Sequence, residues 1–184
     1  MKITSVSKNN KIAQIANSGE VVFRDTDLAV IWRIINKNTL YTTIKRYVQQ
    51  GVLERVKYGV YSLKNPKTIN PDVIGAKILH QYCYVSTETI LERAGILKQK
   101  ITRVTFVSGS SKKFSVGDYS FSSRQMKDDF LYNNLGIYMK DGINYASIAR
   151  AVADLLYFNP QYYFDSHMNI DWDKVREIKK IIGY

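Results

Sequence analysis

The chain has 184 residues, a hydrophobic fraction of 45% and a formal net charge of +11, as expected for a folded protein of one large or two small domains. No apolar stretch approaches the roughly 20 residues that span a bilayer, and the N-terminus lacks the apolar segment of a secretory signal. The single cysteine, Cys83, excludes an internal disulfide framework and multi-cysteine metal sites. We therefore expect a cytoplasmic protein that makes no use of a membrane.

The excess positive charge is concentrated in the first part of the chain. Residues 1–70 carry 12 basic and 4 acidic side chains, for a net charge of +8, whereas residues 71–184 carry 15 and 12, for +3. Such an imbalance predicts a surface for a polyanion in the first part. General solubility charge is the alternative that charge alone leaves open.

A short helix and a strand are predicted first. Ser5 or Ser7 is suited to cap a helix whose apolar residues are Ile12, Ile15 and Ala16. Asn17-Ser18-Gly19 ends this helix. Val21-Val22-Phe23 is a short apolar segment, and we expect it to join the sheet of a later hairpin.

Two capped helices separated by a polar turn are predicted next. Asp25 is the expected N-cap of the first, and Asn36-Lys37-Asn38 interrupts the pattern, with Asn38 as the N-cap of the second. Gly51 ends the second helix. The helical spacing rests on Leu28, Ile31, Trp32 and Ile35 in the first helix, and on Leu40, Ile44, Tyr47 and Val48 in the second.

A hairpin completes the pattern. Residues 52–56 and 60–63 alternate as strands around Lys57-Tyr58-Gly59. Helix, turn, helix and hairpin in this order predict a winged helix-turn-helix, which places its second helix in the DNA major groove. The residues expected at the DNA surface are Asn38, Thr39, Tyr41, Thr42, Thr43, Lys45, Arg46 and Gln49 of the helix and Arg55, Lys57 and Tyr58 of the hairpin.

Each of these residues is assigned a DNA contact according to the length and chemistry of its side chain. Short side chains near the N-terminus of the helix reach base edges, and Arg46 is the candidate for a guanine contact or, equally, for a phosphate contact. Tyr41 is suited to a phosphate or a thymine methyl, and the hairpin residues are suited to backbone phosphate or an adjacent minor groove. A solvated face of an amphipathic helix is the alternative for any one of them, and winged helices also serve as protein-docking modules.

A second domain follows a linker. Two prolines and no periodicity mark residues 65–71 as the linker, so the predicted division is 1–64, 65–71 and 72–184. Pro71 opens a helix to about His80, Ser86 caps another to Ala94, Ser147 begins one to Tyr157, and Asp171 caps a last amphipathic helix. Strands are expected at 101–107, 113–116, 119–122 and 136–139, with turns at 117–118 and 141–142. The predicted fold class is α+β, a winged helix-turn-helix followed by a mixed α/β domain.

No motif in the chain predicts catalysis. His80 and His167 have no partner motif, and Asp171 and Asp173 are explained by a helix start. A Gly-Ser pair precedes Asp118, as in nucleotidyltransferases, but the second metal-binding acid is missing. There is also no phosphate-binding Gly-rich loop. We therefore expect no enzyme, no cofactor and no metal.

With both domains considered, the chain resembles the AbiEi family of antitoxins of type IV toxin–antitoxin (abortive infection, phage defence) systems. The similarity covers roughly residues 20–157. It rests on the hairpin at 53–63, Tyr84-Val85-Ser86 with the following 89–96, the strand at 101–107, and the helix at 146–156. Ile148 and Ala149 replace the usual Pro and Glu of that helix, whereas Arg150 and Asp154 match.

The resemblance implies a winged helix that represses its own operon at inverted repeats of double-stranded DNA. It also implies a C-terminal domain that counteracts a cognate nucleotidyltransferase toxin without a stable complex. Arg150 and Asp154 are spaced to pair on one helix and have either an antitoxic or a structural role. A second basic group of phosphate-binding or merely solvated residues comprises Lys98, Lys100, Arg103, Lys112 and Lys113. The alternatives are a protein-interaction module and a simple transcriptional regulator without an antitoxin role.

Overall fold

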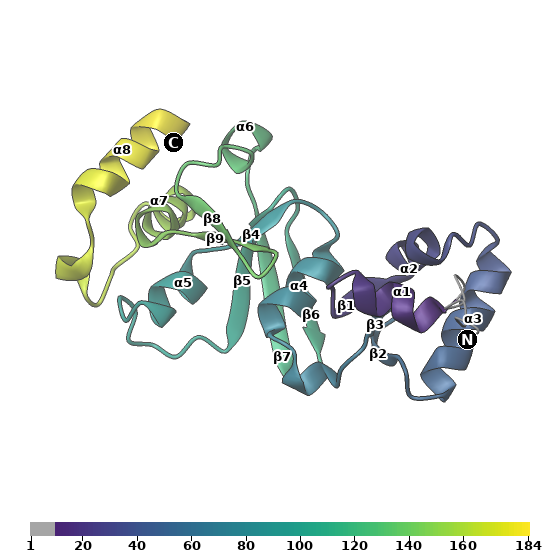
Figure 1. Cartoon of the computed structure of the whole chain (residues 1–184). Coiled ribbons are helices and arrows are strands. Elements are labelled where there is room, and N and C mark those ends of the chain that lie inside the picture. The colour runs from purple at the N-terminus through teal and green to yellow at the C-terminus, as the bar shows by residue number, and fades with distance from the viewer. Residues whose placement is uncertain (1–9) are drawn as a thin grey trace, which may run out of the picture. The chain divides into compact units, whose positions relative to one another are not determined.

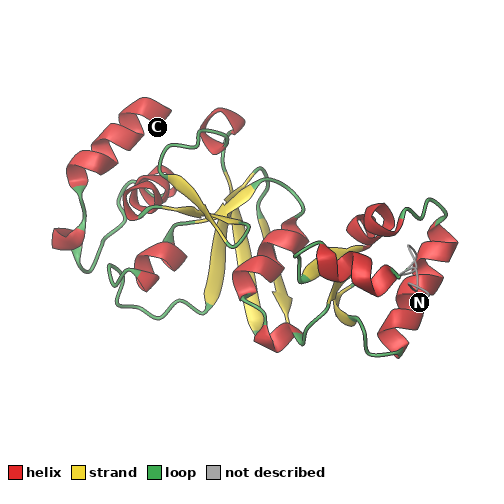
Figure 2. Cartoon of the chain, in the orientation of Figure 1, coloured by secondary structure: helices red, strands yellow, loops and turns green. Residues whose placement is uncertain are grey.

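The computed structural model describes residues 10–184, and the chain divides into two compact units (Figure 1). The first unit ends at Ile69 and the second begins at Asn70, inside the predicted linker. Both units combine helices and strands (Figure 2), so the fold class is α+β. None of the described helices has the length and apolar character needed to cross a membrane.

The described part of the first unit contains three α-helices and a small antiparallel sheet of order β1-β3-β2. Strand β1 pairs with β3 along Val22↔Ser62, so the predicted strand does join the hairpin sheet. The elements are α1 (Lys11–Asn17), β1 (Val22–Arg24), α2 (Asp25–Trp32), α3 (Lys37–Gln49), β2 (Glu54–Lys57) and β3 (Val60–Ser62).

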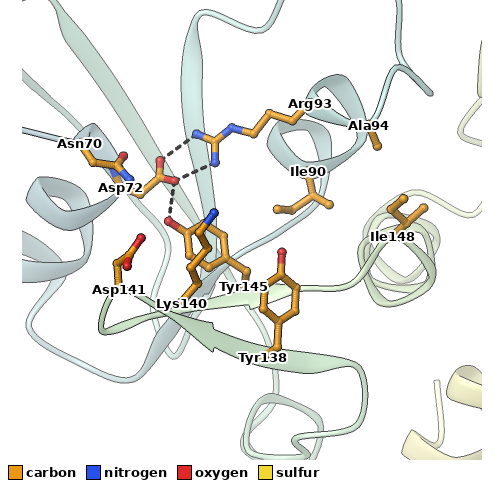
Figure 3. A pocket seen from close by; sticks show the side chains of 10 residues that line it. All are labelled: Asn70, Asp72, Ile90, Arg93, Ala94, Tyr138, Lys140, Asp141, Tyr145 and Ile148. Carbon is orange, nitrogen blue, oxygen red and sulfur yellow. Dashed lines mark hydrogen bonds and ion pairs between the residues drawn. The ribbon is translucent and has the colours of Figure 1, made fainter.

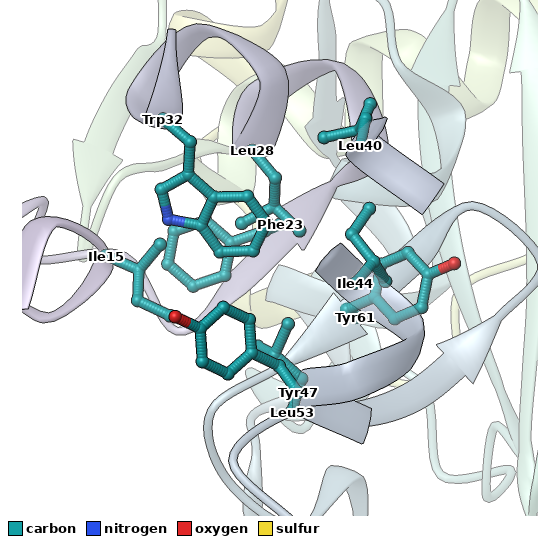
Figure 4. Packing of buried hydrophobic residues seen from close by; sticks show 9 residues of the cluster. All are labelled: Ile15, Phe23, Leu28, Trp32, Leu40, Ile44, Tyr47, Leu53 and Tyr61. Atoms are coloured by element: carbon teal, nitrogen blue, oxygen red, sulfur yellow. The ribbon is translucent and has the colours of Figure 1, made fainter. Parts of the chain in front are cut away.

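One apolar cluster holds these elements together (Figure 4). The Trp32 and Tyr47 rings lie 5.5 Å apart, and the Trp32 indole N–H donates to the Lys11 carbonyl at 3.0 Å, which ties α1, α2 and α3 together. Large aromatic rings provide much of the apolar area available to so small a unit. The cluster comprises Ile15, Phe23, Leu28, Trp32, Leu40, Ile44, Tyr47, Leu53 and Tyr61.

Two predicted caps of the first unit are wrong, because each helix begins earlier than expected. Arg24 precedes α2, and its N–H donates to the Asp27 carboxylate at 2.9 Å, so Asp25 is already helical. Asn36, not Asn38, caps α3, with its side-chain oxygen accepting the Thr39 N–H at 3.1 Å. An Asx oxygen satisfies the N–H three residues ahead, and this geometry selects Asn36.

The first helix of the pair is also shorter than predicted. Arg33 adopts a left-handed backbone, with φ of 54°, and ends α2 after Trp32. Ile35 therefore lies in the turn and is 98% exposed, instead of lining the core. At the other end of the unit, Asn10 caps α1, while Ser5 and Ser7 lie outside the described residues.

The second unit is built on a six-stranded mixed sheet of order β6-β7-β5-β4-β9-β8. The β4/β9 and β5/β7 pairs are parallel, and the other pairs are antiparallel. The strands are β4 (Cys83–Val85), β5 (Arg103–Ser108), β6 (Lys112–Val116), β7 (Tyr119–Gln125), β8 (Ile137–Lys140) and β9 (Ile143–Ala146).

Helices cover this sheet. Gly75 lets α4 approach closely, because a Cβ there would lie only 2.6 Å from the Phe106 ring. Helix α8 packs on α7, and Ser147 and Asp171 cap these two helices as predicted. The helical segments are η1 (Pro66–Thr68) in the linker, α4 (Pro71–Leu79), α5 (Glu88–Arg93), α6 (Asp128–Leu131), α7 (Ile148–Phe158), η2 (His167–Asn169) and α8 (Trp172–Ile182).

The predicted Ser86 cap is wrong for a reason that bears on the interior. The Ser86 hydroxyl donates to the Asp154 carboxylate at 2.7 Å, so this side chain is directed into the interior and Thr87 takes the N-cap position. Helix α5 begins instead at Glu88, after Thr87, whose φ is 53°. The side chain that the sequence pattern assigns to capping therefore forms a hydrogen bond with the buried Asp154 carboxylate.

Candidate functional site

Helix α3 presents a polar face with no acidic side chain. Leu40, Ile44 and Tyr47 point into the core, and the rest of the helix is largely exposed. Lys45 and Arg46 are exposed toward the C-terminal end of the helix, and the Arg46 guanidinium lies 5.3 Å from the Tyr47 ring centre. An aromatic ring under a guanidinium steadies it without removing its charge. The exposed predicted residues of this helix are Asn38, Thr39, Tyr41, Thr42, Lys45, Arg46 and Gln49.

Two α3 residues that are predicted to contact DNA already interact with other groups of the protein. The Thr43 hydroxyl donates to the Thr39 carbonyl at 2.8 Å, and the residue is only half-exposed. The Tyr41 hydroxyl lies 3.5 Å from the Asp25 carboxylate, which raises the pKa of Tyr41. A phosphate near Tyr41 would meet the negative charge of Asp25, so a thymine methyl suits this position better.

The β2–β3 hairpin carries the remaining predicted residues. Tyr58 is 84% exposed at its tip, and Arg55 and Lys57 are exposed along β2. The Arg55 guanidinium lies 6.0 Å from the Tyr61 ring centre. Gly59 has a φ of 74°, so the tight turn places Tyr58 outward, and the Gly59 carbonyl accepts the Asp25 N–H at 3.0 Å. This bond fixes the hairpin against the start of α2.

Sequence reasoning missed one cation of this face. Lys37 is the first residue of α3 and is exposed. The signal was present in the sequence, since taking Asn36 as the cap puts Lys37 in the first helical turn. Arg33 is also exposed in the turn before α3.

The structure divides the second predicted basic group. Arg103 pairs in register with Ser120 and Lys113 with Ser122, so Arg103 and Lys113 point to the same side of the sheet. Lys112, one residue earlier on β6, points to the opposite side, because successive strand residues alternate. Lys98 and Lys100 are exposed in the loop before β5. These five residues do not form one continuous face.

Arg150 and Asp154 form a buried centre in the second unit. Both side chains are 0% exposed, and the Arg150 Nε–H donates to Asp154 at 2.8 Å, as the four-residue spacing predicts. The remaining Arg150 donors reach the carbonyls of residues 130, 133 and 135 and the Tyr84 hydroxyl. Asp154 also accepts from Ser86 and from the Tyr184 hydroxyl. Neither side chain is accessible to a partner, so the geometry gives them a structural role.

Burial controls the ionisation of the two tyrosines at this centre. Desolvation, followed by the nearby Asp154 charge, raises the pKa of Tyr84 and of Tyr184. Both hydroxyls therefore stay protonated at neutral pH and can donate to the centre. Among residues 10–184, no group of three or more histidine, cysteine or acidic side chains is arranged to hold a metal ion.

Comparisons with known proteins add information on the fold alone. No protein-family model matches the sequence, and no curated protein is significantly similar to it. Among solved structures, the Rv2827c protein of Mycobacterium tuberculosis is similar, with a TM-score of 0.54 over 92% of this chain and 69% of that chain. The two sequences are 10% identical. The likeness therefore concerns the arrangement of helices and strands.

Proposed function

We propose that this protein is a DNA-binding repressor of the antitoxin type, whose first unit is a winged helix-turn-helix. Helix α3 inserts into the major groove of operator DNA, and the β2–β3 hairpin contacts the adjacent backbone. The second unit, in line with the resemblance to AbiEi antitoxins, counteracts a nucleotidyltransferase toxin.

One observation carries the DNA-binding proposal: the exposed face of α3 combines short polar side chains near its N-terminus with cations further along, and has no carboxylate. Thr39 and Thr42 are short enough to let the helix approach base edges. Lys45 and Arg46 are exposed cations in the following turn. The turn between α2 and α3, residues 33–36, has the length that a helix-turn-helix requires. The net charge of +8 on residues 1–70 further supports a polyanionic partner.

A gel-shift experiment tests this proposal. The full chain is titrated onto DNA from immediately upstream of its own operon, at several salt concentrations. Phosphate contacts release counterions, so log K should fall with log salt by about 0.9 for each contact. The double substitution Lys45→Ala with Arg46→Ala should abolish the shift. Absence of any shift at low salt with this DNA would contradict the proposal.

A matched control separates the face of α3 from charge in general. Lys174 and Lys180 are exposed on α8, and replacing both with alanine removes the same two charges from the second unit. We expect this variant to bind the operator like the wild type. Equal loss in both double variants would assign the shift to net charge instead of to α3.

The antitoxin part has its own test. The nucleotidyltransferase of the neighbouring gene is expressed with the full chain or with the Lys45→Ala, Arg46→Ala variant, and cell growth is followed. We expect the variant to neutralise the toxin, because the second unit is unchanged. Loss of neutralisation by this folded variant would contradict the division of roles between the units.

A protein-interaction module is the second candidate function, and one observation favours it. Val30 and Ile35 are 78% and 98% exposed on α2 and in the turn before α3. Apolar side chains at such positions suit a docking partner better than a polyanion. Charged substitutions at both positions should leave the gel shift intact if α3 reads DNA.

A further inference from the structure

The second unit contains a cavity of about 420 Å³ beside the β8–β9 hairpin and its turn (Figure 3). This volume is in the range of small-molecule sites in proteins. Its walls come from segments that are distant in the sequence: the start of α4, helix α5, the β8–β9 hairpin and the start of α7. None of these residues belongs to the proposed DNA surface.

One wall of the cavity is a fixed ion pair. The Asp72 carboxylate is 1% exposed and accepts two hydrogen bonds from Arg93, at 2.7 and 2.8 Å, and one from the Tyr145 hydroxyl at 3.0 Å. Burial, and then the Asp72 charge, raise the pKa of Tyr145 to about 12, so its hydroxyl remains a donor at neutral pH. Asp72 therefore neutralises Arg93 and holds its guanidinium at the cavity, and the Arg93 side chain as a whole is 42% exposed.

A second pair of charges at the cavity is free. Lys140 and Asp141 are exposed, and no ion pair joins either of them to another described residue. Lys140 pairs with Ile143 across the hairpin, and Asp141 and Gly142 have φ of 51° and 75°. This is the two-residue turn that an Asp-Gly pair favours, and it fixes the backbone from which both charged side chains extend. The cavity thus offers one free cation and one free anion.

The opposite side of the cavity is apolar. Figure 3 shows Ile90, Ala94 and Ile148 on the side away from Asp72 and Asp141. The Tyr138 ring stacks on Tyr145 at 5.8 Å and lies between the two sides. Ile148 is 42% exposed although it is a large apolar residue at the start of a helix. A ligand that fits must therefore carry both charges at one end and an apolar group at the other.

We propose that this cavity binds a free α-amino acid with an apolar side chain. Lys140 and the outer N–H groups of Arg93 receive the carboxylate, Asp141 receives the ammonium group, and the side chain lies along Ile90, Ala94 and Ile148. A simple anion would lie beside the Asp141 carboxylate and a simple cation beside the Lys140 ammonium group, so each would be repelled by a like charge. This proposal does not depend on the DNA-binding proposal, because the two use different residues.

Calorimetric titration of the full chain tests the proposal with four probes. L-leucine and L-phenylalanine should bind. N-acetyl-L-leucine lacks the ammonium charge and L-leucinamide lacks the carboxylate, so each should bind about tenfold more weakly or worse, because a charge-assisted hydrogen bond is lost. Binding of N-acetyl-L-leucine as tight as that of leucine would overturn the proposal in favour of a carboxylate site. Absence of binding by both amino acids at millimolar concentration would overturn it altogether.

Substitutions on the exposed turn locate the site without disturbing the core. Lys140→Gln and Asp141→Asn each remove one charge, and asparagine tolerates the left-handed backbone at 141. Each should weaken leucine binding about tenfold. Lys113→Gln, an exposed charge removed from β6, is the matched control and should bind like the wild type. Unchanged leucine binding in both turn variants would place the amino acid elsewhere and contradict the assignment.

Discussion

Removing Arg150 should destabilise the second unit severely. The side chain is 0% exposed and makes five hydrogen bonds, one to Asp154, one to Tyr84 and three to backbone carbonyls. Arg150→Met keeps much of the apolar volume but leaves the Asp154 carboxylate buried without its cation. Breaking a buried pair in this way costs about 3–5 kcal/mol. That is a large share of the 5–15 kcal/mol by which a typical domain is stable.

The assay uses the two tryptophans, which lie in different units. Trp172 belongs to α8 in the second unit and Trp32 to the core of the first. In a Trp32→Phe background, fluorescence during urea unfolding reports the second unit alone. The urea midpoint of Arg150→Met should fall, and the free energy of unfolding obtained from it should be about 3–5 kcal/mol lower. Hydrogen exchange should also rise at residues 130–135, whose carbonyls lose their donors.

Two comparisons make this prediction refutable. Arg176→Met breaks an exposed pair with Asp173 and should cost about 1 kcal/mol or less. The double variant Arg150→Met with Asp154→Leu removes both buried charges, so it should be more stable than the sum of the two single changes allows. A cost for Arg150→Met no larger than that for Arg176→Met, or strict additivity in the double variant, would refute the reasoning.

Three further predictions use the same urea assay. Gly75→Ala should cost about 1–3 kcal/mol, because its Cβ would lie 2.6 Å from a phenylalanine ring of the sheet. Gly109→Ala, whose Cβ would meet nothing closer than 3.8 Å, is the control. Asn36→Ala should cost the first unit about 1 kcal/mol as a lost cap, read from Trp32 fluorescence, whereas Asn38→Ala should be nearly neutral. The pKa of Tyr145 rises from 10.0 to about 12 on folding. The stability that the protonated Tyr145 hydroxyl contributes to the folded state is therefore complete below pH 10 and is lost as the pH rises to about 12. Tyr145→Phe should flatten that alkaline decline of the unfolding free energy, and an equally steep decline in the variant would contradict the assignment.

Periodicity predicted the long elements of the fold, and local chemistry set their ends. The apolar residues of α3 and α7 lie at helical spacing, and the structure contains both helices. The caps predicted at residues 25, 38 and 86 were wrong, because Arg24, Asn36 and Thr87 take the N-cap positions of these helices. The Ser86–Asp154 bond shows that a tertiary contact can direct a side chain suited to capping into the interior.

Two short strands and the assembled sites were not predicted in the same way. Strands β4 (Cys83–Val85) and β9 (Ile143–Ala146) were not among the predicted strands, although other strands equally short were. The spacing of Arg150 and Asp154 predicted their pairing, but nothing local indicated that both would be fully buried. The cavity brings Asp72, Ile90 and residues 138–148 together, and only the sheet order makes them neighbours.

The position of β4 in the middle of its sheet has a consequence for synthesis on the ribosome. Val85 pairs on one side with Phe106 and on the other with Tyr145, so one edge of β4 has no partner until residues 143–146 have emerged. The strand pairs in the described part of the first unit lie between residues 22 and 62 and are complete much earlier. An open strand edge invites pairing with other chains, and such long-range pairing also forms slowly. We therefore expect the second unit to be more prone to aggregation during synthesis than the first.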